Sequence, residues 1–186
     1  MGTNICVGLT GPNASGKGEI ATYLEESGLA RHSLSDVVRE EANLQGLDHS
    51  RESLIRIGTW LRDKFGPGIL AERILPLLGG RSVVDSIRNP GEIEVLRRLP
   101  DFFLLGVDAP MEIRFERSRS RGRSGDGLTL EDFRKKESLE QSDGGPGQQL
   151  RVCLSLSDVA VINDGTIPEL RRKVREALAP RGIPLD

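Results

Sequence analysis

The segment Gly11–Glu19, with the sequence GPNASGKGE, lies between the apolar run 4–10 (NICVGLT) and the amphipathic run 19–28 (EIATYLEESG). A G-x-x-x-x-G-K loop between a strand and a helix turns successive backbone N–H groups toward one point, where the helix dipole adds positive potential. Lys17 supplies an ammonium group for the β- and γ-phosphates, and Gly11 and Gly16 permit backbone conformations that larger residues resist. The segment therefore predicts a phosphate-binding loop, with nucleotide contacts from Gly11, Asn13, Ala14, Ser15, Gly16, Lys17, Gly18 and Glu19.

Apolar runs like the one before this loop recur along the chain, with helix-like stretches between them. This alternation is typical of a parallel sheet covered by helices. Further strands are expected at 30–35, 82–85, 102–108 and 159–163, and helices at 36–46, 51–65 and 68–78. The sequence therefore predicts an α/β fold with a five-stranded parallel sheet flanked by helices.

Capping residues mark two further helix starts. Asn89 is followed by Pro90 and by the acid Glu92, and Thr166 with Glu169 fits a capping box. Another helix is expected to begin near Pro110. These starts support the alternation of strands and helices.

The composition sets limits on the class of protein. With 186 residues, the chain has the length of one domain, expected to span 1–186. The net charge of −2 argues against nucleic acid or an anionic membrane as a partner, and no apolar run has the length of a membrane span. Cys6 and Cys153 form no metal-type pair and are expected to be free thiols in a reducing compartment. We therefore expect a cytoplasmic protein.

Gly18 stands where the common phosphate-loop pattern has a serine or threonine that contacts Mg²⁺. The metal must then be held through its own waters and the phosphate oxygens. The sequence GKG at 16–18 resembles the loop of adenylate kinases and related nucleoside monophosphate kinases, in which magnesium is held largely through water. The resemblance implies ATP and Mg²⁺ as cofactors. Glu19 departs from it, because adenylate kinases usually have threonine there.

Other segments resemble the same kinases in chain order. In SLSDVVRE (33–40), the resemblance implies that Asp36 and Arg39 lie at the acceptor, with Arg39 gripping its phosphate. Asp36 and Asp85 each follow an apolar segment, so both could meet at the C-terminal edge of the sheet and order the magnesium waters. In VVDSIRNPGE (83–92), Asp85 matches the family acid, whereas Arg88 stands one place earlier than the family arginine and Ser86 replaces a glycine. Asp36 could instead only cap a helix, and Arg88 could be a surface arginine paired with a nearby glutamate.

The segment VINDGTIPEL (161–170) looks like the corresponding part of dephospho-coenzyme A kinases and of phage-type deoxynucleoside monophosphate kinases. The resemblance places Asn163 near the adenine of ATP, although an Asn-Asp-Gly turn with no ligand is an equal alternative. It implies a P-loop kinase fold of three layers, with an acceptor-side flap at about 36–78 and a short lid at about 118–135. Within the flap, Arg62 could reach an acceptor phosphate.

The segment IRFERSRSRGR (113–123) carries five arginines and one glutamate. On a helix, Arg114, Arg117 and Arg121 share a face, and their mutual repulsion would be relieved by an anion. The segment resembles the lid arginines of monophosphate kinases, with Arg117 and Arg121 as the best matches and Arg123 next. The alternative is a solvated face balanced by the acids at 131–140.

Taken with the phosphate loop, these matches predict a kinase that transfers the γ-phosphoryl group of ATP to a nucleoside or deoxynucleoside monophosphate, with Lys17, Arg88, Arg117 and Arg121 as catalytic residues. Dephospho-coenzyme A is the nearest alternative acceptor. A regulatory module that binds nucleotide and turns it over slowly is an alternative of another class, and a nucleic-acid end kinase is disfavoured by the acidic net charge.

Overall fold

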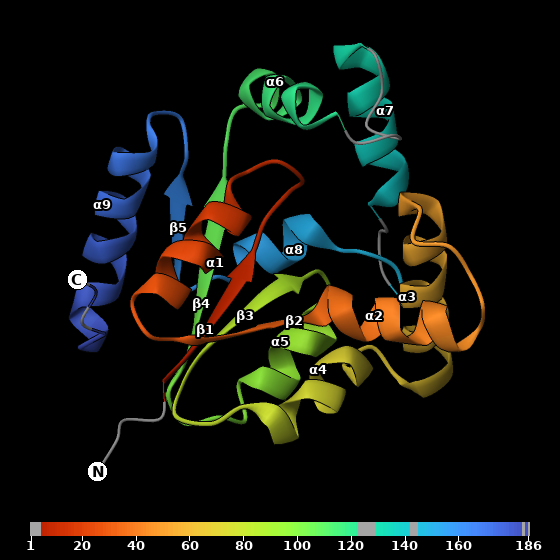
Figure 1. Cartoon of the computed structure of the whole chain (residues 1–186), viewed down its shortest axis with the longest axis horizontal. Helices are drawn as coiled ribbons and strands as arrows, with labels where there is room; N and C mark the ends of the chain where they lie inside the picture. The colour runs from red at the N-terminus through yellow and green to blue at the C-terminus, as the bar shows by residue number, and fades with distance from the viewer. Residues whose placement is uncertain (1–4, 123–128, 142–144, 184, 186) are drawn as a thin grey trace.

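The structure is a computed structural model that describes residues 5–122, 129–141, 145–183 and 185. These residues form a five-stranded sheet in the order β2-β3-β1-β4-β5, and every strand pairs in parallel with its neighbours (Figure 1). The α/β fold and the parallel sheet predicted from the sequence are thereby confirmed. The strands are β1 (Ile5–Thr10), β2 (Ala30–Ser33), β3 (Arg81–Ile87), β4 (Phe102–Asp108) and β5 (Val159–Ile162).

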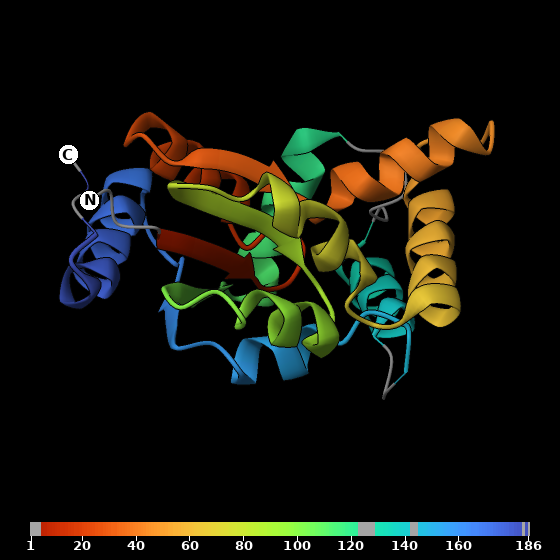
Figure 2. The same ribbon diagram turned by 90° about the horizontal axis from the view of Figure 1, so that it is seen from below.

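Helices cover both faces of the sheet, which gives three layers (Figure 2). One buried cluster joins the sheet to α1 and α9, and a second joins it to α2, α3, α4, α5 and α8. The helices are α1 (Lys17–Glu26), α2 (Leu34–Leu44), α3 (Arg51–Phe65), α4 (Ile69–Ile74), α5 (Pro90–Leu96), α6 (Met111–Arg121), α7 (Leu130–Glu140), α8 (Leu150–Ser155) and α9 (Ile167–Leu178), with 3₁₀ turns at Leu75–Leu77 and Ala179–Arg181.

The burial of each strand follows from its place in the sheet. Every residue of the central strand β1 is buried, whereas the edge strands β2 and β5 are partly exposed. A central strand of a parallel sheet contacts helices on both faces, and its sequence is therefore apolar without alternation. This explains why the run before the phosphate loop is the clearest strand signal in the chain.

The helix starts agree with the capping residues. Both capping boxes form: Asn89 with Glu92 begins α5, and Thr166 with Glu169 begins α9. The predicted helix 68–78 is shorter, because it ends as α4 at Ile74 and continues as a 3₁₀ turn that contains Pro76. The short helix α8 was not predicted.

The segments predicted to form the flap and the lid are largely helical where the structure describes them. The segment 36–78 contains most of α2, then α3, α4 and a 3₁₀ turn, and α2 and α3 lie on the right of Figure 1. Helices α6 and α7 lie beyond the end of β4. Part of the predicted lid, with Arg123, falls outside the described residues. In the described part of the chain, the helices are too short or too polar to cross a membrane.

Candidate active site

The loop between β1 and α1 has the backbone conformation that its glycines were expected to allow. Gly11 and Gly16 have φ angles of 140° and 106°. A Cβ atom on Gly11 would lie 1.9 Å from the carbonyl oxygen of Val107, and one on Gly16 would lie 2.1 Å from Nδ2 of Asn163. Glycine is therefore required at both positions by the backbone angle and by the space.

The side chain of Lys17 folds back over this loop. Its Nζ donates hydrogen bonds to the carbonyl oxygens of Gly11 at 2.7 Å and Pro12 at 2.6 Å. Burial lowers the pKa of the Lys17 ammonium group from its ordinary 10.5 to about 7, and the positive charge of Arg88 acts in the same direction. Lys17 thus lies in a positive environment that an anion would stabilise.

Asn163 braces the loop from the end of β5. Its buried Nδ2 donates to the carbonyl oxygen of Ser15 at 2.9 Å. Its own backbone and side-chain oxygens accept from Arg117, both at 3.2 Å. The structure therefore joins two residues predicted to contact ATP, and it places the Asn163 amide against the loop itself.

Arg114 connects the same loop to α6 and α7. Its guanidinium forms an ion pair with Glu137 of α7 and donates to the carbonyl oxygens of Ala109 at 3.0 Å and Asn13 at 3.3 Å. The charge expected to need an anion at position 114 is thus neutralised by Glu137. The pairing partner lies 23 residues away, so helical spacing gave no signal for it.

The end of β3 carries Asp85 and Arg88. One oxygen of Asp85 accepts from the backbone N–H of Ser86 at 2.6 Å, and the other lies 3.4 Å from Nη2 of Arg31. Ser86 has a φ angle of 67°. Arg88 donates to Oε1 of Gln148 at 2.8 Å. Arg31 was missed by sequence reasoning, because it lies in a weak edge strand without a recognisable motif.

Four other predicted residues are engaged with neighbouring side chains. Asp36 and Arg39 pair with each other at 2.7 Å near the start of α2, and Asp36 is 72% exposed. Glu19 accepts two hydrogen bonds from Arg171 of α9. Arg62 is buried and pairs with Glu92 at 2.7 Å, so its guanidinium is held inside the protein.

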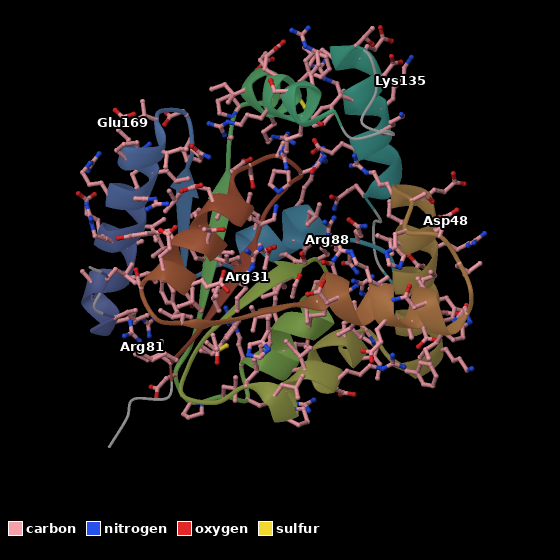
Figure 3. The ribbon with its side chains drawn as sticks, viewed as in Figure 1. Arg31, Asp48, Arg81, Arg88, Lys135 and Glu169 are labelled. Atoms are coloured by element: carbon pink, nitrogen blue, oxygen red, sulfur yellow. The ribbon has the colours of Figure 1, made fainter. Side chains whose placement is uncertain are left out.

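One cleft of about 1270 Å³ contains nearly all of these residues. Among the described residues predicted for catalysis or for nucleotide, acceptor or metal binding, Gly11 lies outside its lining. Figure 3 labels Arg31 and Arg88, from β2 and from the end of β3, in the central part of the molecule. The predicted lining residues are Asn13, Ala14, Ser15, Gly16, Lys17, Gly18, Glu19, Asp36, Arg39, Arg62, Asp85, Arg88, Arg117, Arg121 and Asn163.

Comparison with known proteins identifies relatives that match most of this chain, although the chain spans only about half the length of one of them. The chain is 33% identical over 174 residues to a UPF0200 protein of Sulfurisphaera tokodaii, covering 92% of this chain and 94% of that protein. It is 33% identical over 180 residues to a UPF0200/UPF0201 protein of Archaeoglobus fulgidus, of which it covers 54%. No protein-family model matches the chain.

Solved structures share the fold at low sequence identity. A protein from Thermus thermophilus is 22% identical with a TM-score of 0.63, covering 95% of this chain and 97% of its own. A shikimate kinase from Acinetobacter baumannii, solved with shikimate, has a TM-score of 0.60 at 11% identity, with coverage of 96% and 95%. A gluconokinase from Sinorhizobium meliloti has a TM-score of 0.56 at 14% identity, with coverage of 97% and 94%. These likenesses establish the P-loop kinase fold.

Proposed function

This chain belongs to the UPF0200 family, and we propose that it transfers the γ-phosphoryl group of ATP to a small anionic acceptor. The observation that carries the proposal is the electrostatic environment of Lys17. Arg88, after β3, and Arg121, in α6, line the same cleft as Lys17, and their positive charges lower its pKa. Cations that converge on a glycine-rich loop suit a transferring phosphoryl group, which spreads negative charge over its oxygens.

Each half of the cleft has a proposed role. The loop N–H groups and Lys17 hold the β- and γ-phosphates, while Arg117 and Asn163 lie on the side of the base. Arg88 and Arg121 place positive charge on the transferring group. Transfer of this kind needs little covalent participation from the protein, so these residues act by alignment and by charge.

Magnesium fits this site as a water-held ion. In the residues that the structure describes, no group of three or more histidine, cysteine, aspartate or glutamate side chains could enclose a metal. Asp85 and Asp36 line the cleft and would hold the metal through its waters, and Asp85 is the better placed because it is largely buried beside the loop. The metal would supply charge neutralisation of the phosphates.

We propose a nucleoside or deoxynucleoside monophosphate as the acceptor. The cleft is lined by Arg31 of β2 and, from the predicted flap, by Arg39 and Arg51 together with the apolar Leu54 and Ile55. Such a lining suits a phosphate attached to a flat, weakly polar group. Dephospho-coenzyme A fits the same description less well because it is longer, and the shikimate and gluconate of the structural neighbours carry a carboxylate in place of the phosphate.

A coupled assay of ADP formation tests both the reaction and the acceptor. Purified protein is given Mg²⁺, ATP and, one at a time, the ribo- and deoxynucleoside monophosphates, dephospho-coenzyme A, shikimate and gluconate. We expect turnover with at least one monophosphate and its loss by orders of magnitude in Lys17→Met. Turnover with dephospho-coenzyme A alone would change the acceptor. No turnover with any compound, while ADP still binds, would favour the regulatory module.

A further inference from the structure

Glu92 is a fully buried acid that joins two separate segments of the protein. Its Oε2 accepts from the backbone N–H groups of Arg88 at 2.8 Å and Asn89 at 3.0 Å. Its Oε1 accepts from Nε and Nη2 of Arg62 at 2.8 and 2.7 Å. One carboxylate therefore binds α3 of the flap to the backbone of the proposed catalytic Arg88.

Helix capping does not account for this arrangement. Glu169 performs the same capping role at the start of α9, where its Oε2 accepts from Thr166, but that carboxylate is exposed. Capping uses only one oxygen of Glu92 and can be performed in solvent. Burial of the acid with Arg62 has a large desolvation cost, which the ion pair and its hydrogen bonds offset. The second oxygen of Glu92 thus serves the contact with α3.

The segment that Glu92 holds is also fixed from its other side. Nδ2 of Asn89 donates to the carbonyl oxygens of Gly145 and Gly147, and the carbonyl oxygen of Arg88 accepts from the backbone N–H of Gln149. The backbone at positions 88 and 89 is therefore held on one side by the 145–149 segment and on the other by Glu92. A displacement of Arg62 must be transmitted to this backbone, because close-packed interiors leave little free space.

We propose that Arg62 and Glu92 are positioning residues that couple the placement of α3 to that of the Arg88 guanidinium. This inference rests on the proposed function, because it requires Arg88 to act on the transferring phosphoryl group. It also assigns Arg62 an action through Glu92 and Arg88 in place of direct contact with the acceptor. When the acceptor settles against the flap, α3 and Arg88 reach their working positions together.

The test is a kinetic comparison of Arg62→Met, Arg88→Ala and the double variant, with the best acceptor from the assay above. Arg62→Met should lower kcat at saturating acceptor by about 10-fold to 100-fold, the scale of loss from misplaced catalytic groups. The dissociation constant for ADP should stay within about threefold of wild type, since the phosphate loop is unchanged. In the Arg88→Ala background, the same Arg62→Met change should have almost no further effect on kcat, because its effect passes through Arg88.

Two controls separate positioning from general loss of stability. Val174→Ala removes buried volume from the other core cluster and should lower the thermal midpoint without changing kcat at a temperature where it is folded. Glu169→Gln weakens the exposed capping box and should also leave kcat unchanged. Should Arg62→Met fail to fold, Arg62→Lys keeps the charge but loses the forked contact, and the same non-additivity with Arg88→Ala is expected.

The possible results are distinct. Losses that multiply in the double variant, with wild-type turnover intact, would overturn the inference and leave the proposed function standing. A rise in acceptor KM with unchanged kcat in Arg62→Met would also overturn it and would support direct contact with the acceptor. Absence of wild-type turnover with every acceptor would overturn both the proposed function and this inference.

Discussion

Lys17 should take up a proton when ADP binds to the phosphate loop. In the free protein, burial and the charge of Arg88 lower its pKa to about 7. The phosphates of bound ADP favour the charged ammonium group and raise this pKa again. At pH 8 the ammonium form makes up about one tenth of the free protein, so binding should take up about 0.9 proton, falling to about 0.1 proton at pH 6.

Isothermal titration calorimetry measures this uptake directly. ADP is titrated at pH 8 in buffers of different ionisation enthalpy, and the slope of the observed enthalpy gives the number of protons. Phosphate groups are almost fully ionised at this pH, so the ligand contributes little. Lys17→Arg is the matched control, because arginine stays charged at every pH used and should show almost no uptake. The wild-type affinity for ADP should also fall by about tenfold per pH unit above pH 7.

Either of two results would refute this reasoning. Equal uptake by wild type and Lys17→Arg would show that another group titrates. Tight binding by wild type with no uptake would show that the ammonium group is already charged before the anion arrives. The pH dependence of stability gives a second test of the lowered Lys17 pKa. In the unfolded chain, Lys17 keeps its proton up to about its ordinary pKa of 10.5, so the unfolded state binds more protons than the folded state above pH 7. Raising the pH above 7 should therefore increase the free energy of unfolding of wild type relative to that of Lys17→Met.

Three substitutions and one labelling experiment have defined outcomes. Gly18→Ser should fold normally and alter turnover by less than about fivefold, because a Cβ there meets no atom within 4 Å. Asp85→Asn should raise the Mg²⁺ concentration needed for the half-maximal rate. A magnesium titration in which Gly18→Ser changes this concentration more than Asp85→Asn does would contradict a metal held through water. Ser86→Gly should raise the free energy of unfolding by about 0.5 to 1 kcal/mol by relieving the positive φ angle, and an unchanged urea midpoint would count against that strain. Cys6 and Cys153, whose pKa values burial raises to about 12, should resist a thiol reagent at pH 8 until the protein is denatured; rapid labelling of the native protein would show that they are accessible.

Local features of the sequence predicted the fold well. The sheet, the phosphate loop and the capping boxes at Asn89 and Thr166 each depend on residues a few positions apart, whose effect on the backbone is strong. The α8 helix was missed because Leu150–Ser155 is too short to show a helical period.

The pairing of charged side chains could not be read in the same way. Helical spacing groups Arg114 with Arg117, but the partners that neutralise Arg114 and Arg62 are Glu137 and Glu92, which only folding brings near. The sequence does not distinguish an arginine that is buried in an ion pair from an arginine that binds a ligand. The roles of the cleft residues therefore stay predictions, although the fold gathers most of them in one place.

Asn163 links the last strand of the sheet to the first loop of the chain. Its amide holds Ser15 across a separation of 148 residues and fills the space beside Gly16. A chain emerging from the ribosome contains the loop sequence long before the residue that braces it. If the loop binds nucleotide as proposed, the nascent protein should reach full nucleotide affinity only after β5 has docked against the loop.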